Sequence, residues 1–190
     1  MSEVCVAKVR KGAWAPAVLE AMERLVLASG ARGRTLLDDE LRRCDILYLA
    51  SDADGLLAFL LVARVRLPVG AECRQARYLG LSAVRQDRMG SEAAAAVYTR
   101  FAADAQREEQ ELRIRLPLFT TTETPFAFRA AHSFWTDVHP AQDGSFPESL
   151  LPVASAAALW LGKTPSAPQA KGGRLVLFCS PASGVQSEAA

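Results

Sequence analysis

The spacing of hydrophobic positions changes several times along the chain, and each change predicts a new element. Alternating apolar residues over 4–9 predict a first strand, and apolar residues three and four apart over 16–27 predict a helix that stops at Ser29 and Gly30. Acidic residues precede basic ones over 35–44, which is typical of a short helix. The chain is therefore expected to begin with one strand and two helices.

The clearest local pattern is a β-hairpin in the first half of the chain. Two apolar runs, 45–50 and 56–67, flank a turn at Asp54 and Gly55, where glycine suits the positive φ of a tight turn. A further run over 73–84, uncharged in its second half, predicts a central strand. This part of the chain is therefore expected to supply the centre of a sheet.

A long helix is the main feature predicted for the second half of the chain. The alanine-rich run 90–106 has high helix propensity and carries an apolar stripe at Ala93, Val97, Phe101 and Ala105. Small alanines allow such a helix to lie close to a sheet. The other elements expected are a strand at 111–116 that ends at Pro117, a loop at 120–125, helices at 125–134 and 147–161, a turn at 139–144 and a last strand at 174–179.

Composition indicates one main domain followed by a short extension. We expect residues 1–162 to form the domain and residues 163–173, which contain prolines and adjacent glycines, to be a linker. Residues 174–180 then complete the sheet of the same chain or are exchanged with a second subunit, and residues 181–190 form a disordered tail. The exchange alternative makes a homodimer an expectation.

Composition and charge narrow the classes of function. Of 190 residues 50% are hydrophobic and 23% charged, and the formal net charge of +1 provides no global field for binding nucleic acid or an anionic membrane. The longest apolar run, 55–65, is about half the length of a membrane helix. Residues 1–15 lack the pattern of a signal peptide, which predicts a cytoplasmic protein. The abundance of alanine and arginine resembles the usage of high-GC bacteria.

The cysteines do not have the spacing of a metal site. Cys5, Cys44, Cys73 and Cys179 lie far apart, with neither a Cys-x-x-Cys pair nor a histidine close to any of them. Reduced cysteines in apolar runs are expected to pack as small hydrophobic residues. No metal ion is therefore expected as a cofactor.

A predicted strand runs into the start of the long helix over residues 79–97, with the sequence LGLSAVRQDRMGSEAAAAV. Backbone N–H groups at such a helix start bind pyrophosphate without many charged side chains. This junction, together with the order of predicted elements over 4–135, resembles the GNAT acyltransferase superfamily. The runs FTTTETP at 119–125 and WTDVHPAQDGSFP at 135–147 are similar to a bacterial branch of GNAT-like proteins.

The resemblance implies both a fold and a co-substrate. The fold is α/β, with a mixed, mostly antiparallel sheet of six or seven strands that is flanked by helices. The sheet is expected to splay near Ala83 and Val84 and to admit a pantetheine arm there. The implied co-substrate is acetyl-CoA or another acyl-CoA.

The family's acyl-CoA motif is Gln or Arg, two residues, Gly, one residue, then Gly or Ala, and it fits this chain in two registers. A start at Arg88 puts Ser91 and Ala93 at the small positions, whereas a start at Met89 puts Glu92 at the first glycine. We favour the first register, because Glu92 would repel a pyrophosphate. The residues expected to bind acyl-CoA are Ala83, Val84, Arg85, Arg88, Met89, Gly90, Ser91 and Ala93. The alternative is a plain helix start, capped by a side chain and without a ligand.

The resemblance also implies catalytic groups. In active GNAT enzymes a carboxylate often accepts the amine proton, and a tyrosine often protonates the departing thiolate. Glu123 is the expected base. Because the predicted helix 125–134 has phenylalanine where a tyrosine is usual, Tyr98 or Tyr78 is the expected acid. His132 is a further candidate, since histidine titrates near neutral pH.

The function predicted is transfer of an acyl group, acetyl above all, from acyl-CoA to an amine of a small molecule by direct attack in a ternary complex. The protein is expected to position the reactants and to supply a backbone donor for the oxyanion. Two alternatives stay open. One is a catalytically inactive GNAT-like module that binds a ligand or a protein, and the other is an acyltransferase whose donor is an acyl carrier protein facing Arg85, Arg88 and Arg42–Arg43.

Overall fold

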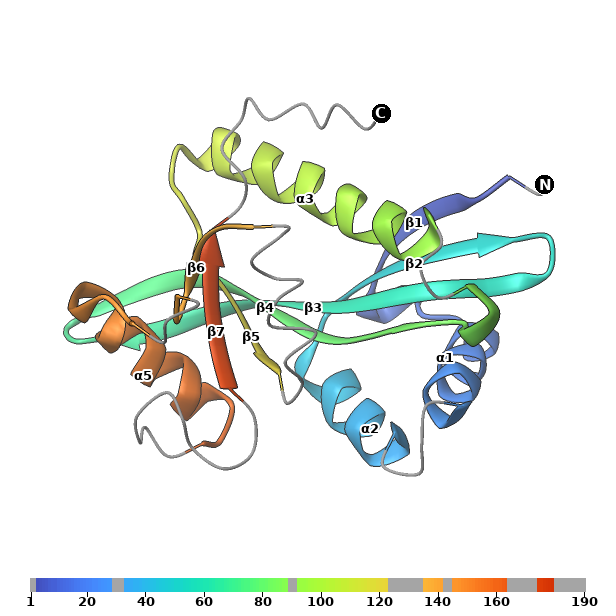
Figure 1. Cartoon of the computed structure of the whole chain (residues 1–190), viewed down its shortest axis with the longest axis horizontal. Coiled ribbons are helices and arrows are strands. Elements are labelled where there is room, and N and C mark those ends of the chain that lie inside the picture. Colours follow the sequence, from blue (N-terminus) through green and yellow to red (C-terminus); the bar gives the residue numbers. More distant parts are fainter. Residues whose placement is uncertain are drawn as a thin grey trace. The chain divides into compact units, whose positions relative to one another are not determined.

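The computed structural model describes residues 3–28, 33–88, 92–122, 135–141, 145–163 and 174–179, the last of these by backbone alone (Figure 1). The chain divides into two compact units. Unit 1 comprises Met1–Arg64 and Leu79–Asp104, and unit 2 comprises Val65–Tyr78 and Ala105–Ala190.

The described residues form β-strands, α-helices and short 3-10 helices. The strands are β1 (Cys5–Arg10), β2 (Ile46–Asp52), β3 (Gly55–Val69), β4 (Glu72–Val84), β5 (Leu118–Thr122), β6 (Thr136–His139) and β7 (Arg174–Cys179). The α-helices are α1 (Pro16–Ala28), α2 (Gly33–Arg43), α3 (Glu92–Leu112) and α5 (Leu151–Trp160), and the short 3-10 helices are η1 (Lys11–Ala13), η2 (Gln86–Arg88) and η3 (Glu148–Leu150). Across these ranges the strand order is β1-β2-β3-β4-β5-β7-β6. This mixed, mostly antiparallel sheet with helices confirms the expected fold class.

Unit 1 is a sheet with helices on both faces (Figure 1). β1 pairs antiparallel with β2, and β2 pairs antiparallel with β3, with a shift of register between Ala50 and Ser51. α1 and α2 lie on one face of these strands, and the first part of α3 lies on the other. Residues 57–63 of β3 are accordingly buried without interruption. A strand that is covered on both faces needs such a continuous apolar run.

The predicted stripe of α3 packs as expected. Ala93, Val97, Phe101 and Ala105 are each 2% exposed, so the helix buries the face that the sequence pattern marked. The Phe101 ring meets the ring of Tyr48 on β2 edge to face, with centroids 5.6 Å apart. The alanines bring the helix close enough to the sheet for this aromatic contact.

A buried carboxylate joins α3 to the first two strands. Asp104 accepts from Lys8 of β1 at 3.1 Å and from the Tyr48 hydroxyl of β2 at 3.2 Å, and it lies 3.4 Å from the Arg100 guanidinium. Burial by itself would raise the pKa of Asp104. The hydrogen bond and positive charge of Lys8, together with Tyr48 and Arg100, outweigh the effect of burial, so the pKa is lowered. The carboxylate is therefore ionised and holds three elements together.

Unit 2 is built on the far end of the β3–β4 hairpin, which turns at Gly70 with a φ of 63°. β5 runs parallel to β4, with Arg77 opposite Leu118 and Tyr78 opposite Phe119. β7 lies between β5 and β6 and pairs antiparallel with both. The rings of Tyr78, Phe119 and Trp160 of α5 contact one another, with centroids 5.1 to 5.7 Å apart. These rings form the aromatic part of the core of unit 2.

Arg77 is a buried charge at the start of the β4–β5 pairing. The residue is 2% exposed, and its guanidinium donates to Glu108 at 2.9 Å, to Glu109 at 3.0 Å and to the Ala105 carbonyl at 3.0 Å. Glu109 also accepts from the backbone N–H of Leu116 at 3.2 Å. One buried arginine thus ties β4 to the last turns of α3 and to the segment that follows them.

The strand predicted over 111–116 is wrong. α3 continues to Leu112 and ends at Arg113, whose φ is 54°, and the Ile114 N–H closes the helix by donating to Glu109 O at 3.2 Å. Leu112 and Ile114 are each 45% exposed, so their alternation does not mark a buried face.

Other boundaries differ as well. β5 begins after Pro117, which makes residues 120–122 strand instead of loop, and β6 was not expected at all. The predicted helix 125–134, most of the linker and the tail 181–190 lie outside the described residues. None of the described helices is long and apolar enough to span a membrane.

Replacing Arg77 with Ala is expected to lower the free energy of unfolding by about 3 kcal/mol, because the partly buried carboxylates of Glu108 and Glu109 lose a buried cationic partner. The measurement is urea unfolding at neutral pH. Arg74→Ala on the same strand is the control. Arg74 is 54% exposed and lies 3.7 Å from Glu72, so its loss is expected to stay within about 0.5 kcal/mol. Equal losses in the two variants would contradict the structural role of Arg77.

Asp104→Asn is expected to lower stability at neutral pH and to have little effect in acid. The folded-state pKa of Asp104 lies below its ordinary value, so the carboxylate contributes its full stability above that ordinary value. The contribution is lost as the pH falls through the folded-state pKa. Unfolding by denaturant at several pH values measures the difference between parent and variant, and a difference that stays constant into acid would show that charge is not its source.

Candidate functional site

β4 changes its surroundings half-way along its length. Residues 76–79 are buried, whereas every residue from Gly80 to Arg85 is half-exposed or exposed. The side chains of Gly80, Ser82 and Ala83 are small. Within unit 1 taken by itself, β4 is the edge strand, next to β3. An accessible strand edge with small side chains leaves room for an extended ligand beside its backbone.

β4 leads into the turn that precedes α3. The Arg85 N–H donates to Leu57 O of β3 at 2.7 Å, and the Arg88 N–H donates to Arg85 O at 2.8 Å, so backbone bonds hold the turn. Of the residues predicted to bind acyl-CoA, Met89, Gly90 and Ser91 lie outside the described residues. Ala83, Val84, Arg85 and Arg88 lie together along β4 and η2, while Ala93 is buried in the packing of α3.

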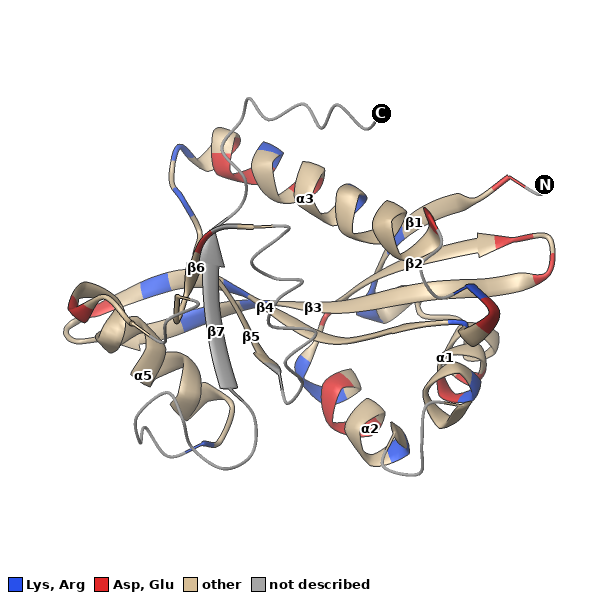
Figure 2. Ribbon diagram, in the orientation of Figure 1, with Lys and Arg blue, Asp and Glu red and all other residues tan. Residues whose placement is uncertain are grey.

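The two predicted phosphate-binding arginines have carboxylate partners. Arg85 donates to Asp87 at 2.8 Å, and Arg88 lies 3.9 Å from Asp87 and 3.7 Å from Asp52, which is 2% exposed. The hydrogen bond with Asp87 raises the pKa of Arg85, and the same bond lowers the pKa of Asp87. Figure 2 shows these opposite charges side by side at η2. A phosphate at this turn therefore competes with Asp87.

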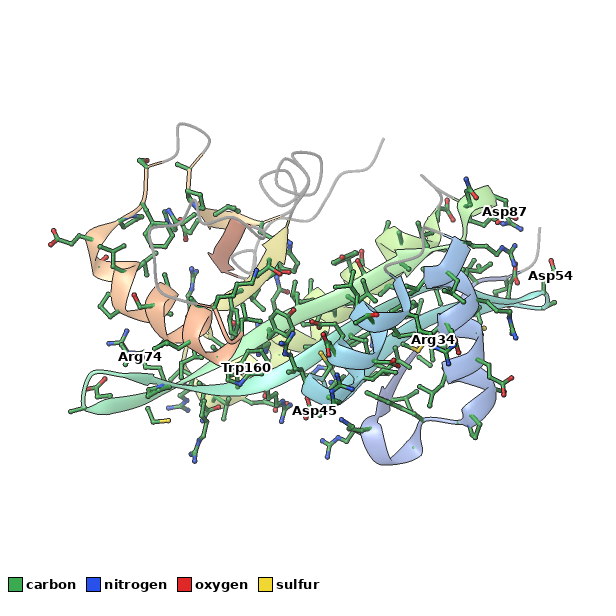
Figure 3. All side chains as sticks on the ribbon, turned by 90° about the horizontal axis from the view of Figure 1, so that it is seen from below. Arg34, Asp45, Asp54, Arg74, Asp87 and Trp160 are labelled. Atoms are coloured by element: carbon green, nitrogen blue, oxygen red, sulfur yellow. The ribbon has the colours of Figure 1, made fainter. Side chains whose placement is uncertain are left out.

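The β2–β3 turn adds further negative charge to the same end of unit 1. Asp54, at this turn, and Asp87 are labelled in Figure 3 and lie at the same end of unit 1 in that view. Asp54 donates its backbone N–H to Asp52 at 2.9 Å, and the charges of Asp52 and Asp54 act on Arg85. The three aspartates offset the positive charge of Arg85 and Arg88. This end of unit 1 therefore attracts an anionic ligand less strongly than the two arginines alone would.

Tyr98 of α3 reaches the exposed half of β4. Its hydroxyl donates to the Ser82 Oγ at 3.0 Å. Burial raises the pKa of Tyr98, and the Ser82 hydroxyl, which can also donate to the phenolate, acts in the opposite direction. The phenol is therefore protonated at neutral pH and has a proton to give. Tyr78, the other predicted acid, is 3% exposed within the aromatic core of unit 2.

Glu40 of α2 approaches the same strand and was not predicted from the sequence. It is 7% exposed, and a Cβ placed on Gly80 would overlap its Oε2 and crowd the Cys44 sulfur. Arg43 lies 3.3 Å from Oε1, and the Cys44 thiol donates to Oε2 at 3.7 Å. Burial, then the Glu40 charge, raises the pKa of Cys44, so this thiol stays protonated. The signal in the sequence was present: Leu37 and Glu40 share the buried face of α2, and the buried Cys44 follows directly after the helix ends.

Two ionisable groups thus converge on one short piece of β4. Glu40 comes from α2 and meets Gly80, and Tyr98 comes from α3 and meets Ser82. The two helices lie on opposite faces of the sheet of unit 1 (Figures 1 and 3). Gly80 and Ser82 are about 7 Å apart along a strand. The arrangement brings a carboxylate to one face of β4 and a phenol to the other.

Comparison with known proteins identifies the fold. No family model matches the sequence, and no curated protein matches it either. Among solved structures, a protein of Desulfovibrio desulfuricans assigned to the GNAT acetyltransferases covers 92% of this chain and 98% of its own, with a TM-score of 0.51 and 15% identity. The chain has the GNAT fold.

Two further solved structures cover different shares of the chain. An Enterococcus faecalis V583 protein assigned as an N-acyltransferase matches 70% of this chain with a TM-score of 0.52 and 12% identity, and this chain spans only 32% of it. A bacterial toxin matches 94% of this chain and 92% of its own, with a TM-score of 0.55 and 11% identity. At these identities the likeness shows the GNAT fold alone. Glu123 and His132, predicted as catalytic groups on that fold, lie outside the described residues.

Asp87→Asn is expected to strengthen binding of inorganic pyrophosphate about threefold, since Arg85 and Arg88 are then released from an exposed carboxylate. Calorimetric titration at low and high salt measures the affinity, and the gain should shrink as salt rises. Asp38→Asn, an exposed aspartate of α2, removes the same charge elsewhere and is the control. Unchanged affinity in Asp87→Asn would mean that this pair does not compete with phosphate.

Proposed function

We propose that the chain transfers an acyl group from acyl-CoA to an amine by direct attack in a ternary complex. The observation that carries this proposal is the exposed half of β4, where Tyr98 donates to Ser82 beside small side chains. The GNAT fold supports the reaction class, because this fold is that of acetyltransferases. A small-molecule amine is the proposed acceptor.

The donor is proposed to lie along β4 and to end with its phosphates at the start of α3. Ala83 and Val84 are half-exposed residues, and the backbone of an edge strand suits the amide groups of a pantetheine arm. Arg85 and Arg88 follow at η2, and a helix N-terminus favours negative charge. Because Asp87 and Asp52 already engage these arginines, the affinity is expected to depend more on the arm than on the phosphates.

Tyr98 is the proposed general acid. Attack of the amine nitrogen on the thioester carbonyl forms a C–N bond, and collapse of the adduct breaks the C–S bond and leaves a thiolate. A phenol whose pKa is raised by burial stays protonated until the thiolate forms, and Ser82 orients it. A backbone N–H of the exposed β4 segment is the proposed donor to the oxyanion.

The same charges weigh against an acyl carrier protein as donor. Such a partner is acidic and needs free basic residues on the surface that it meets. Here Asp87 accepts from Arg85, and Asp52 lies beside Arg88, which reduces the positive charge at η2. If an acyl carrier protein nevertheless binds, its affinity should fall steeply with salt.

Calorimetric titration with acetyl-CoA and a medium-chain acyl-CoA tests the proposal. The parent chain is expected to bind in the micromolar range. Arg88→Glu should weaken binding about tenfold, because it places a carboxylate among Asp52 and Asp87. Arg10→Glu, an equally large charge change at the exposed end of β1, should bind as the parent does.

Tyr98→Phe separates binding from chemistry. It should bind acyl-CoA like the parent and transfer the acyl group at least about tenfold more slowly at saturating substrate, since only the acid is lost. Absence of heat and of a thermal shift at millimolar acyl-CoA would refute the proposal and leave a non-catalytic module with this fold.

A further inference from the structure

The open edge of the sheet at β1 is a surface that the proposed acyl transfer does not use. β1 is the terminal strand of the described sheet and pairs only with β2. Every residue of β1 is exposed or half-exposed. An edge strand presents unpaired N–H and C=O groups, and proteins normally protect it with a proline, a bulge or a charged side chain. Whether β1 has such protection decides whether a further strand can join the sheet.

The hydrogen bonds to β2 fix which main-chain groups of β1 point to the open edge. The two strands pair over the whole of β1 without a shift of register. One step further along the same ladder, the Lys11 N–H donates to Asp45 O at 2.8 Å. Because hydrogen-bonded pairs alternate in an antiparallel ladder, the odd-numbered residues of β1 bond to β2. The N–H and C=O groups of Val6, Lys8 and Arg10 therefore face outward, and no described residue is bonded to them.

β1 lacks the usual protection of an edge. Its sequence, CVAKVR, contains no proline, and its ladder with β2 has no bulge. Lys8 is the charged residue in the middle of the strand, but its Nζ lies 3.1 Å from Asp104 and 5.5 Å from the centre of the Tyr48 ring. The charge is thus turned onto the face that α3 covers. The opposite face of β1 carries the uncharged side chains of the odd-numbered residues.

We propose that two copies of this chain join through this edge, with their β1 strands antiparallel and Ala7 on the two-fold axis. Outward-facing residues of the two strands must lie opposite each other, so one residue of β1 lies opposite its own copy. With Ala7 at the axis, Val6 of one copy bonds to Lys8 of the other, and Val4 bonds to Arg10. The inference is independent of the proposed acyl transfer.

Charge and size favour this register over its neighbours. An axis at Lys8 would place two like charges directly opposite each other, which destabilises a sheet. An axis at Val6 would pair only residues 5–7 of the two strands with one another, whereas the axis at Ala7 pairs residues 5–9. Ala7 also has the smallest side chain of the strand, which suits the axis, where the two Cα atoms approach to about 4.5 Å.

The side chains of the two copies complement each other in the same register. On the uncharged face, Cys5 of one copy lies opposite Val9 of the other, on both sides of the axis. At the two ends Glu3 lies opposite Lys11, and both residues are exposed, so that opposite charges meet. A contact made by one strand is smaller than the roughly 800 Å² per partner of a standard interface, so we expect a dimer with a Kd of about 100 μM.

Sedimentation equilibrium of the full chain, from about 1 μM to about 1 mM, measures the association. Val6→Pro removes an outward N–H that the single chain does not use. It is expected to raise the Kd at least about tenfold and to leave the thermal unfolding of dilute protein close to that of the parent. Ala7→Pro is the matched contrast, because it removes an N–H that bonds to β2 and should unfold at a lower temperature.

A cysteine at the axis tests the register. In a background in which Cys5, Cys73 and Cys179 are replaced by serine, Ala7→Cys is expected to form a covalent dimer on mild oxidation. Two Cα atoms about 4.5 Å apart lie within the reach of a disulfide. Ala13→Cys in the same background is the control, since this exposed residue of η1 lies outside the paired strands and should leave the chain mostly monomeric.

Three results would overturn the proposal. A parent chain that stays monomeric at about 1 mM would exclude the pairing, and the edge would then be open to an extended peptide of another protein. A dimer that persists in Val6→Pro would place the contact elsewhere, as exchange of residues 174–180 would. Equal cross-linking of the two cysteine variants would show that Ala7 is not on the axis.

Discussion

The transition in β4 between Leu79 and Gly80 governs the arrangement of unit 1. Residues 76–79 of the strand are buried, whereas every residue from Gly80 to Arg85 is partly open to solvent, and Gly80, Ser82 and Ala83 have small side chains. A strand interior normally excludes polar side chains, because it offers no water to solvate them. At Gly80 and Ser82 the strand instead meets a carboxylate from one side and a phenol from the other. The local loss of packing is thus what allows ionisable groups to approach the backbone.

Buried charge elsewhere in the chain has a different character. Arg77 and Asp104 each have several partners of opposite charge or hydrogen-bonding oxygen, so their burial joins α3 to the strands. Glu40 has an arginine on its own helix and a thiol among its partners.

Most of the fold could be predicted because its signals are local. The turn at Gly55 and the alanine stripe of α3 are readable within a few residues of sequence, and both are confirmed. The error at 111–116 arose because Leu112 and Ile114 alternate like a strand although they lie exposed at a helix end. β6 is short and polar and gave no periodic signal. Its pairing with β7 depends on a strand far along the chain.

The site was less predictable, since its charges are paired across the fold. Arg85 and Arg88 were expected to be available to phosphate, and nothing near them in sequence except Asp87 indicated otherwise. Asp52, which faces Arg88, comes from the end of another strand. Tyr98 could be named as an acid candidate from its residue type and its helix. Its bond to Ser82 depends on where α3 lies on β4, which the sequence pattern does not specify.

Glycine in the interior of a strand weakens it, because the residue loses the most backbone entropy on folding and offers no side chain for packing. At Gly80 the missing side chain is replaced by the carboxylate of another helix, and the weakening has a structural reason. The phenol of Tyr98 is kept neutral by burial, while Glu40 has a guanidinium beside it.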